Sequence, residues 1–93
     1  MRVISNKRLV DFAALHPEAT AALKVWRKCV EKNRLAHFAD LKALFRSVDR
    51  VGRFCVFDIC GNKLRLFAAV HFDRQMLFVR FVLTHAEYDR RTP

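Results

Sequence analysis

The sequence contains few of the residues that interrupt a folded chain. Only two of its 93 residues are glycine and two are proline, so no Gly/Ser-rich or Pro-rich linker divides it. It also lacks an internal repeat. Because 53% of the residues are hydrophobic, nine of them Phe, disorder is not expected. A chain of this length builds one modest core and not two, which predicts a single domain over residues 1–93.

Cysteine is scarce, and the sequence motifs of several enzyme classes are missing. Cys29, Cys55 and Cys60 are odd in number and match no CxxC or Cys/His zinc spacing. We therefore expect free, buried thiols in a reducing cytoplasm, and neither a bound metal nor another cofactor. No HExxH, P-loop, GxSxG or paired-carboxylate motif is present. Metalloprotease, NTPase and serine hydrolase functions are thus unsupported.

Long hydrophobic runs are absent as well. No apolar run approaches the ~18 residues that a membrane span needs. The opening segment Met-Arg-Val-Ile-Ser does not have the form of a signal peptide. The sequence therefore predicts a cytoplasmic protein without a membrane partner.

Positive charge, by contrast, is abundant. Eighteen Lys and Arg residues oppose nine Asp and Glu, which gives a net charge of +9 and a pI near 10.4. Basic residues outnumber acidic ones in both halves of the chain, so the excess is not confined to a tail. Such a field most often attracts nucleic acid. An acidic protein partner, or a role in solubility alone, would explain the charge too.

The hydropathy pattern predicts helices in the first half of the chain. Residues 2–4 suit a short edge strand, and Ser5 is a suitable N-cap for a following helix. His16-Pro17 should end that helix, and Pro17 is well placed as the first residue of the next. A third short helix or turn is expected over residues 38–45. The second helix carries an apolar stripe of Ala22, Trp26, Cys29 and Val30.

Three strands are expected after residue 50, since the sequence there is rich in Val, Phe, Ile and Leu. The expected strands are Val51–Cys60, Lys63–Asp73 and Met76–Thr84. Gly61-Asn62 suits a two-residue hairpin loop, which places Asp58 opposite Arg65 and Phe57 opposite Leu66.

The second turn is predicted to be the two-residue loop Arg74-Gln75. That loop would align Leu77, Val79, Phe81 and Leu83 on one apolar face, against which the helices would pack. The other face would collect polar and aromatic side chains, namely Asp58, Lys63, Arg65, Phe67, His71, Phe78, Arg80 and Thr84. The predicted class is α+β, with helices on one face of a mainly antiparallel sheet.

This second face has the composition of an RNA-binding surface. Cations neutralise phosphates and aromatic rings stack on unpaired bases, although a solvated face with an Asp58–Arg65 ion pair would look similar. His85 and Tyr88, at the end of the last strand, are the best proton-transfer candidates. A histidine at a strand end can equally be structural or merely exposed.

Two motifs resemble the HigB-type toxins of the RelE/ParE superfamily. They are Gly-Asn-Lys-x-Arg at 61–65 and Thr-His-x-Glu-Tyr-Asp at 84–89. The wider segments around them, 51–67 and 80–89, also resemble these toxins, and so do residues 1–5 and 38–42. The resemblance spans nearly the whole chain. It implies a RelE-like fold and metal-independent acid–base cleavage of mRNA at the ribosomal decoding site. It also implies neutralisation by a HigA-type helix-turn-helix antitoxin.

The resemblance further implies roles for individual residues. Asn62, Lys63 and Arg65 would bind and polarise the phosphate together with Arg80, and His85 and Tyr88 would transfer protons or position the nucleotide. The assignment of general acid and general base stays open among His85, Tyr88 and Lys63. Two alternatives also stay open: a ParE-like gyrase inhibitor that depends on its helical half, and an RNA-binding module without catalysis.

Overall fold

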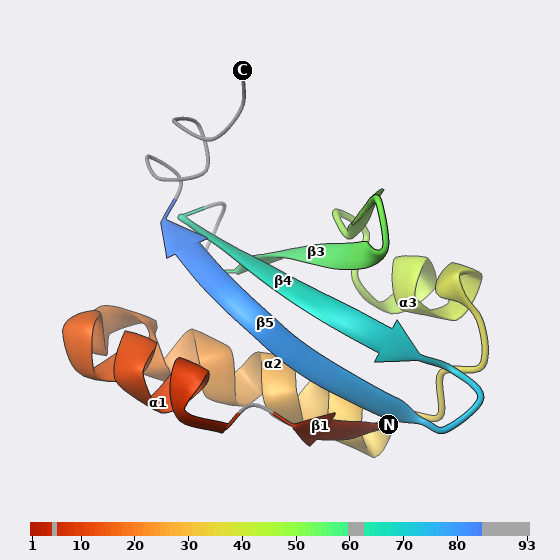
Figure 1. Cartoon of the computed structure of the whole chain (residues 1–93), viewed down its shortest axis with the longest axis horizontal. Coiled ribbons are helices and arrows are strands. Elements are labelled where there is room, and N and C mark those ends of the chain that lie inside the picture. Colours follow the sequence, from red (N-terminus) through yellow and green to blue (C-terminus); the bar gives the residue numbers. More distant parts are fainter. Residues whose placement is uncertain (5, 60–62, 85–93) are drawn as a thin grey trace.

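The computed structural model describes residues 1–4, 6–59 and 63–84 and has helices on one side of a five-stranded sheet (Figure 1). This arrangement confirms the predicted α+β class. In chain order the elements are β1 (Arg2–Ile4), α1 (Asn6–Leu15), a 3₁₀ turn (Pro17–Ala19), α2 (Thr20–Lys32), α3 (Phe38–Leu44), β2 (Asp49–Val51), β3 (Phe54–Ile59), β4 (Leu64–His71) and β5 (Met76–Thr84).

The strands lie in the order β1-β5-β4-β3-β2, and their pairing is antiparallel except at one edge. There β1 runs parallel to β5, with Arg2 opposite Met76. The short edge strand expected at residues 2–4 is therefore confirmed. The pairing of β1 with β5 thus brings together the two ends of the described chain, with the helices between them in sequence.

The expected break between the first two helices occurs at His16-Pro17. Pro17 begins a 3₁₀ turn and α2 starts at Thr20, three residues later than predicted. The buried side of α2 is formed by Leu23, Trp26 and Val30, while the remaining residues of the predicted stripe are half-buried. Ser5, the expected N-cap of α1, lies outside the described residues. No helix in the described part of the chain is long and apolar enough to cross a membrane.

The N-terminus of α3 is closed by a reciprocal cap. The Asp40 carboxylate accepts hydrogen bonds from the backbone N–H groups of Ala36 (2.9 Å) and His37 (3.1 Å). The backbone N–H of Asp40 in turn donates to the backbone carbonyl of His37 at 3.0 Å. These bonds satisfy N–H groups that a helix start otherwise leaves without partners.

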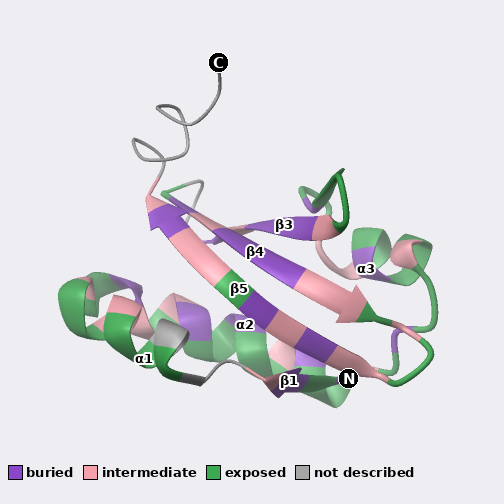
Figure 2. Cartoon of the chain, in the orientation of Figure 1, coloured by how far each residue is buried: buried purple, intermediate pink, exposed green. Residues whose placement is uncertain are grey.

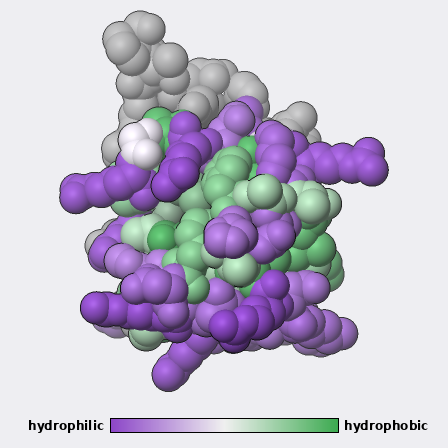
Figure 3. Space-filling view, turned by 90° about the vertical axis from the view of Figure 1, so that its right-hand side faces the viewer, coloured by the Kyte–Doolittle hydropathy of each residue, from purple (hydrophilic) through white to green (hydrophobic). Residues whose placement is uncertain are grey.

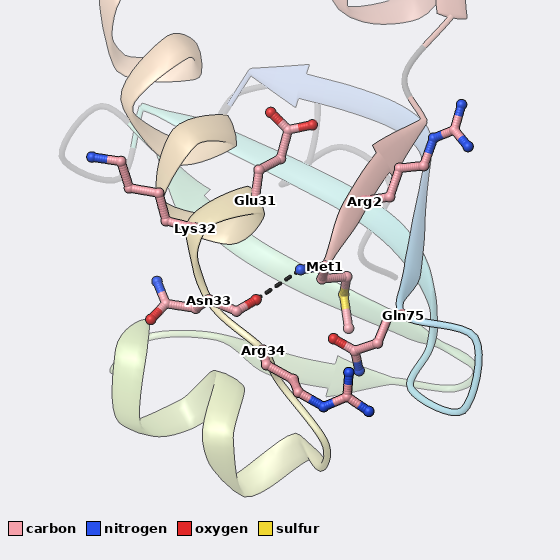
Figure 4. Close-up of a pocket in the computed structure, with 7 residues that line it drawn as sticks. All are labelled: Met1, Arg2, Glu31, Lys32, Asn33, Arg34 and Gln75. Carbon is pink, nitrogen blue, oxygen red and sulfur yellow. Dashed lines mark hydrogen bonds between the residues drawn. The ribbon is translucent and has the colours of Figure 1, made fainter.

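The C-terminal end of α2 is held by the start of the chain. In Figure 4 the amino group of Met1 points toward Asn33, whose carbonyl accepts a hydrogen bond at 2.7 Å; the Val30 carbonyl accepts another at 3.3 Å. A positive charge is favourable where helix carbonyls lack internal partners. The contact therefore fixes β1 against α2.

The main core lies between α2, α3 and the sheet (Figure 2). Phe57 is at its centre, 1% exposed, and its ring meets Trp26 edge-on at 5.3 Å and Phe45 edge-on at 5.2 Å. Edge-to-face rings stabilise one another beyond the area that they bury. Leu41 and Leu66 are fully buried beside these aromatic side chains.

The strand predicted over Val51–Cys60 is wrong at its start. Gly52 adopts φ +60° and turns the chain, so that β2 ends at Val51 and β3 begins at Phe54. Glycine takes this left-handed conformation without steric cost, and here it produces a hairpin between β2 and β3. The register of the next hairpin is confirmed, with Asp58 opposite Arg65 and Phe57 opposite Leu66. Its predicted Gly61-Asn62 loop lies outside the described residues.

The two-residue turn predicted before β5 is wrong. β4 ends at His71 and pairs with Met76, which leaves the four residues 72–75 in the turn. Gln75 has φ 54°, an unusual value for a residue with a side chain. Its side-chain amide nitrogen donates to the carbonyls of Leu35 (2.6 Å) and Phe72 (2.8 Å), and its side-chain oxygen accepts from the Leu35 N–H (3.3 Å). These bonds hold the turn against the segment between α2 and α3.

Replacing Gln75 with alanine is expected to lower the free energy of unfolding by about 1–3 kcal/mol, because backbone groups lose their partners and the left-handed conformation remains. Urea denaturation followed by circular dichroism measures the change. Gln75→Gly, which accepts the backbone angle, should cost less than Gln75→Ala. An alanine variant as stable as the original chain would show that the hydrogen bonds contribute nothing.

A β-bulge at Arg80 corrects the predicted alternation along β5. Ala68 pairs with Val79 but Phe67 pairs with Phe81, so Arg80 is an extra residue in the strand. Leu77 and Val79 face the helices as predicted. An inserted residue reverses the alternation beyond it, so three predictions fail: Phe81 and Leu83 pack on the opposite face, and Thr84 pairs with Leu64 on the helix side.

Candidate nucleic-acid interface

The sheet face turned away from the helices, called the open face below, combines aromatic and cationic side chains. Its members are Phe54, Val56, Asp58, Arg65, Phe67, Ala69, His71, Phe78, Arg80, Phe81 and Leu83. Figure 3, a view of the side of the molecule where α3 lies, shows a hydrophobic area with hydrophilic side chains around it. Such a mixture offers both apolar contact and positive charge to a ligand.

Three phenylalanine rings form the apolar part of the open face. Phe67 and Phe81 stack with ring centroids 4.5 Å apart, and Phe54 meets them edge-on at 6.3 and 5.9 Å. Val56 and Leu83 are buried beside them. Phe67 is itself buried, at 7% exposed, so the half-buried Phe54 and Phe81 form the part of this cluster that a ligand can reach.

Arg65 is held on the open face by the ion pair with Asp58 that the hairpin register predicts. The two side chains are only 21% and 14% exposed. A partly buried guanidinium–carboxylate pair fixes the direction of both groups. The pair therefore presents Arg65 from a defined position and offsets much of its charge.

Lys63 lies just before β4 and is exposed, so it and Arg65 occupy the same end of the open face. Thr84, the last described residue of β5, pairs with Leu64. β5 therefore ends beside the start of β4, next to Lys63. His85, Tyr88 and Asn62 themselves lie outside the described residues. Of the predicted site residues, the structure brings together Lys63 and Arg65.

Arg80 lies on the open face but away from that end. The bulge directs its guanidinium over the Phe78 ring at 5.8 Å from the centroid. Arg80 follows the residue opposite Ala68, about 10 Å along the strand from Arg65 at the usual rise per residue. It can therefore contact a ligand that extends along the sheet from Arg65.

Sequence reasoning gave no role to Arg53 or His71, yet both line a hollow in the open face. The hollow has a volume of about 460 Å³, and its lining consists of Arg53, Phe54, Ala69, His71, Arg80 and Phe81. Arg53 enters it from the β2–β3 turn, which the sequence pattern did not predict. His71 lies at the far end of β4, as expected, and meets the Phe78 ring edge-on at 5.4 Å.

Two other hollows have walls formed mainly by other parts of the molecule, although the second of them includes Asp58 of the open face. One, of about 540 Å³, is shown in Figure 4 and is lined by Met1, Arg2, Glu31, Lys32, Asn33, Arg34 and Gln75. The other, of about 380 Å³, has mostly apolar walls from α2 together with Phe45 and Ile59. Neither contains a residue that the sequence singles out for catalysis.

The described thiols do not form a reactive site. Cys29 and Cys55 are free, as predicted, and Cys55 is buried; Cys60 lies outside the described residues. Burial raises the pKa of the Cys55 thiol, and the charge of Arg50 opposes that shift only in part. A raised pKa leaves little thiolate at neutral pH. Within residues 1–4, 6–59 and 63–84, no three His, Cys, Asp or Glu side chains gather as a metal site would need.

Comparison with known proteins gives concordant matches over almost the entire sequence. The family model for HigB toxins, described as the RelE-like toxic component of a toxin–antitoxin system, matches residues 19–91. The mRNA interferase toxin HigB of Escherichia coli K12 is 35% identical over 92 residues, covering 96% of this chain and 88% of that protein. The mRNA interferase HigB of Escherichia coli O6:H1 is 26% identical over 95 residues, covering 99% and 92%.

Proposed function

The chain belongs to the HigB family of RelE-like toxins, and from that premise we propose that it cleaves mRNA on the ribosome without a metal ion. Its curated relatives are named mRNA interferases, and the chain is accordingly an endoribonuclease toxin. Ribosome dependence, the acid–base mechanism and the roles of individual residues are the parts proposed here.

The observation that carries the proposal is the pairing of a fixed cation with an aromatic surface on one sheet face. Arg65 is held by Asp58 beside the exposed Lys63, and the phenylalanine rings follow along the same face. Cations there neutralise the RNA backbone, whereas rings stack on bases only where the bases are unpaired. The combination favours single-stranded RNA such as mRNA in the decoding site.

The proposed reaction is attack of a ribose 2′-oxygen on the adjacent phosphorus. The 2′-hydroxyl loses its proton, the new P–O bond forms, and the bond to the 5′-oxygen breaks as that oxygen takes up a proton. Lys63 and Arg65 stabilise the negative charge that develops on the phosphate oxygens, and Asn62 contributes to binding the phosphate. His85 and Tyr88 carry the two proton transfers. Arg80 holds the RNA farther along the sheet.

The partners follow from the family and the charge. A toxin of a toxin–antitoxin system has an antitoxin partner, and we propose one of the HigA helix-turn-helix type. The net charge of +9 favours association with ribosomal RNA around the decoding site, because a strongly basic surface increases the rate of encounter with polyanions. The proposed place of action is the cytoplasm.

Brief induction of the toxin in bacteria, followed by primer extension on abundant mRNAs, tests the proposal. We expect cuts confined to translated regions and lost in an Arg65→Ala, His85→Ala double variant, because charge stabilisation and proton transfer are then both missing. An mRNA without its start codon is the matched control and should stay intact. Growth arrest with intact mRNA and blocked DNA supercoiling would instead identify a gyrase inhibitor. RNA binding without cuts would leave a binding module.

A further inference from the structure

The hollow in the open face is separate from the end where cleavage is proposed. Along β4, Arg65 and Ala69 are four residues apart, about 13 Å at the usual rise of a strand. Both side chains lie on the same face. We propose that this hollow binds an unpaired nucleotide of the RNA a short distance from the cleaved bond. The inference rests on the proposed function, and it adds Arg53, Ala69 and His71 to the residues that contact RNA.

The shape of the hollow follows from one small side chain. Ala69 lies on the open face between the larger Phe67 and His71, at alternate positions of β4. Its methyl group leaves space for a hollow of about 460 Å³. That volume falls in the range of small-molecule sites and suits a group as large as a base with its sugar.

Aromatic rings form one wall of the hollow. Phe81 lines it while stacked on Phe67 at 4.5 Å, and Phe54 lines it edge-on to Phe81 at 5.9 Å. Rings held in this way lose little conformational freedom when a base stacks on them. Stacking is possible for every base, because each has a π-face, so this wall favours unpaired nucleotides without selecting one.

Two arginines line the hollow, Arg53 from the β2–β3 turn and Arg80 from β5. Arg53 lies over the Phe54 ring at 5.7 Å, and Arg80 lies over the Phe78 ring at 5.8 Å. In contrast to Arg65, neither forms an ion pair with a carboxylate of the described residues. Their charges are thus available to the phosphates on the two sides of a bound nucleotide. His71 adds a polar group that can contact a base edge.

An acidic peptide would satisfy the two arginines equally well but would make no specific use of the apolar wall. Filling the hollow without altering any charge separates the two ligands. Ala69→Leu does this, because its larger side chain extends into space that is open in the structure. The matched control is Ala43→Leu, an exposed position on α3. For the charges, Arg53→Gln is compared with Arg34→Gln, an exposed arginine away from the open face.

The test measures two quantities on the whole chain. The first is the affinity for a short unpaired RNA with 2′-O-methyl groups, which cannot be cut; Ala69→Leu and Arg53→Gln should each weaken it about tenfold, the scale of one lost stacking or charge contact. The second is the distribution of cut sites in mRNA, which should shift in both variants. The two control variants should match the original chain in affinity and in cut sites.

The outcomes separate the subsite from the proposed function. If the original chain cuts mRNA and both test variants keep its affinity and cut sites, the subsite is overturned and the nuclease stands. If the original chain cuts nothing but Ala69→Leu still weakens RNA binding, the subsite stands and the nuclease fails. If the chain binds an acidic peptide, and Ala69→Leu changes neither the peptide affinity nor the RNA affinity, the nucleotide subsite is overturned. If Ala69→Leu does not fold, Arg53→Gln decides alone.

Discussion

Arg65→Ala is expected to reduce the rate of mRNA cleavage by about 100- to 1,000-fold, the usual loss when one preorganised group that stabilises transition-state charge is removed. Arg65 is suited to this role because Asp58 fixes its guanidinium on the open face. Cleavage of a defined mRNA in a reconstituted translation system measures the rate. Arg65→Lys should recover part of the activity, because it restores the charge without the planar guanidinium.

A control is needed because removing Arg65 also leaves the Asp58 carboxylate without its partner. Asp58 is only 14% exposed, and a partly buried carboxylate without a partner destabilises the fold. The double variant Arg65→Ala, Asp58→Asn removes that effect, and it should remain as inactive as the single variant while unfolding at a higher temperature. Near-normal cleavage by the double variant would contradict a direct role of Arg65.

Phe57→Ala is expected to lower the free energy of unfolding by about 3–5 kcal/mol, the cost of removing a fully buried aromatic side chain. The ring is 1% exposed and makes edge contacts with both Trp26 and Phe45, so a cavity would open between α2 and the sheet. Domains of this size are stable by only about 5–15 kcal/mol. Urea denaturation monitored by Trp26 fluorescence should show a large shift of the midpoint.

Phe12→Ala provides the matched comparison. Phe12 is half-buried and stacks on His16 near the end of α1, so its removal should cost less than about 2 kcal/mol. If the two variants were equally destabilised, the position of Phe57 at the centre of the core would not explain its contribution.

The elements whose signals are local could be predicted from the sequence. Proline after His16 marked the helix break, and the expected two-residue loop Gly61-Asn62 gave the register of Asp58 with Arg65. The hairpin at Gly52 and the bulge at Arg80 could not be predicted. A single glycine does not by itself reveal a reversal of the chain, and a bulge is set by how β5 pairs with β4 rather than by its own residues.

The candidate site shows the same division. Lys63 and Arg65 were found because they share one short motif on one strand. The hollow was missed because its walls come from three strands, and because its defining residue, Ala69, is inconspicuous in the sequence. Alternation along β5 predicted that Phe81 faces the helices. The bulge instead places its ring on the open face, where it lines the hollow.

During synthesis on a ribosome, β1 emerges long before β5, the strand with which it pairs. The parallel pairing of Arg2 with Met76 requires closure of a loop that contains all the helices together with β2, β3 and β4. Contacts between such distant residues form late, because the entropy of loop closure must be overcome first. A nascent chain that ends before β5 lacks the strand that lies between β1 and β4, and with it the open-face residues of β5. The order of translation therefore delays assembly of the proposed nuclease site until β5 has been synthesised.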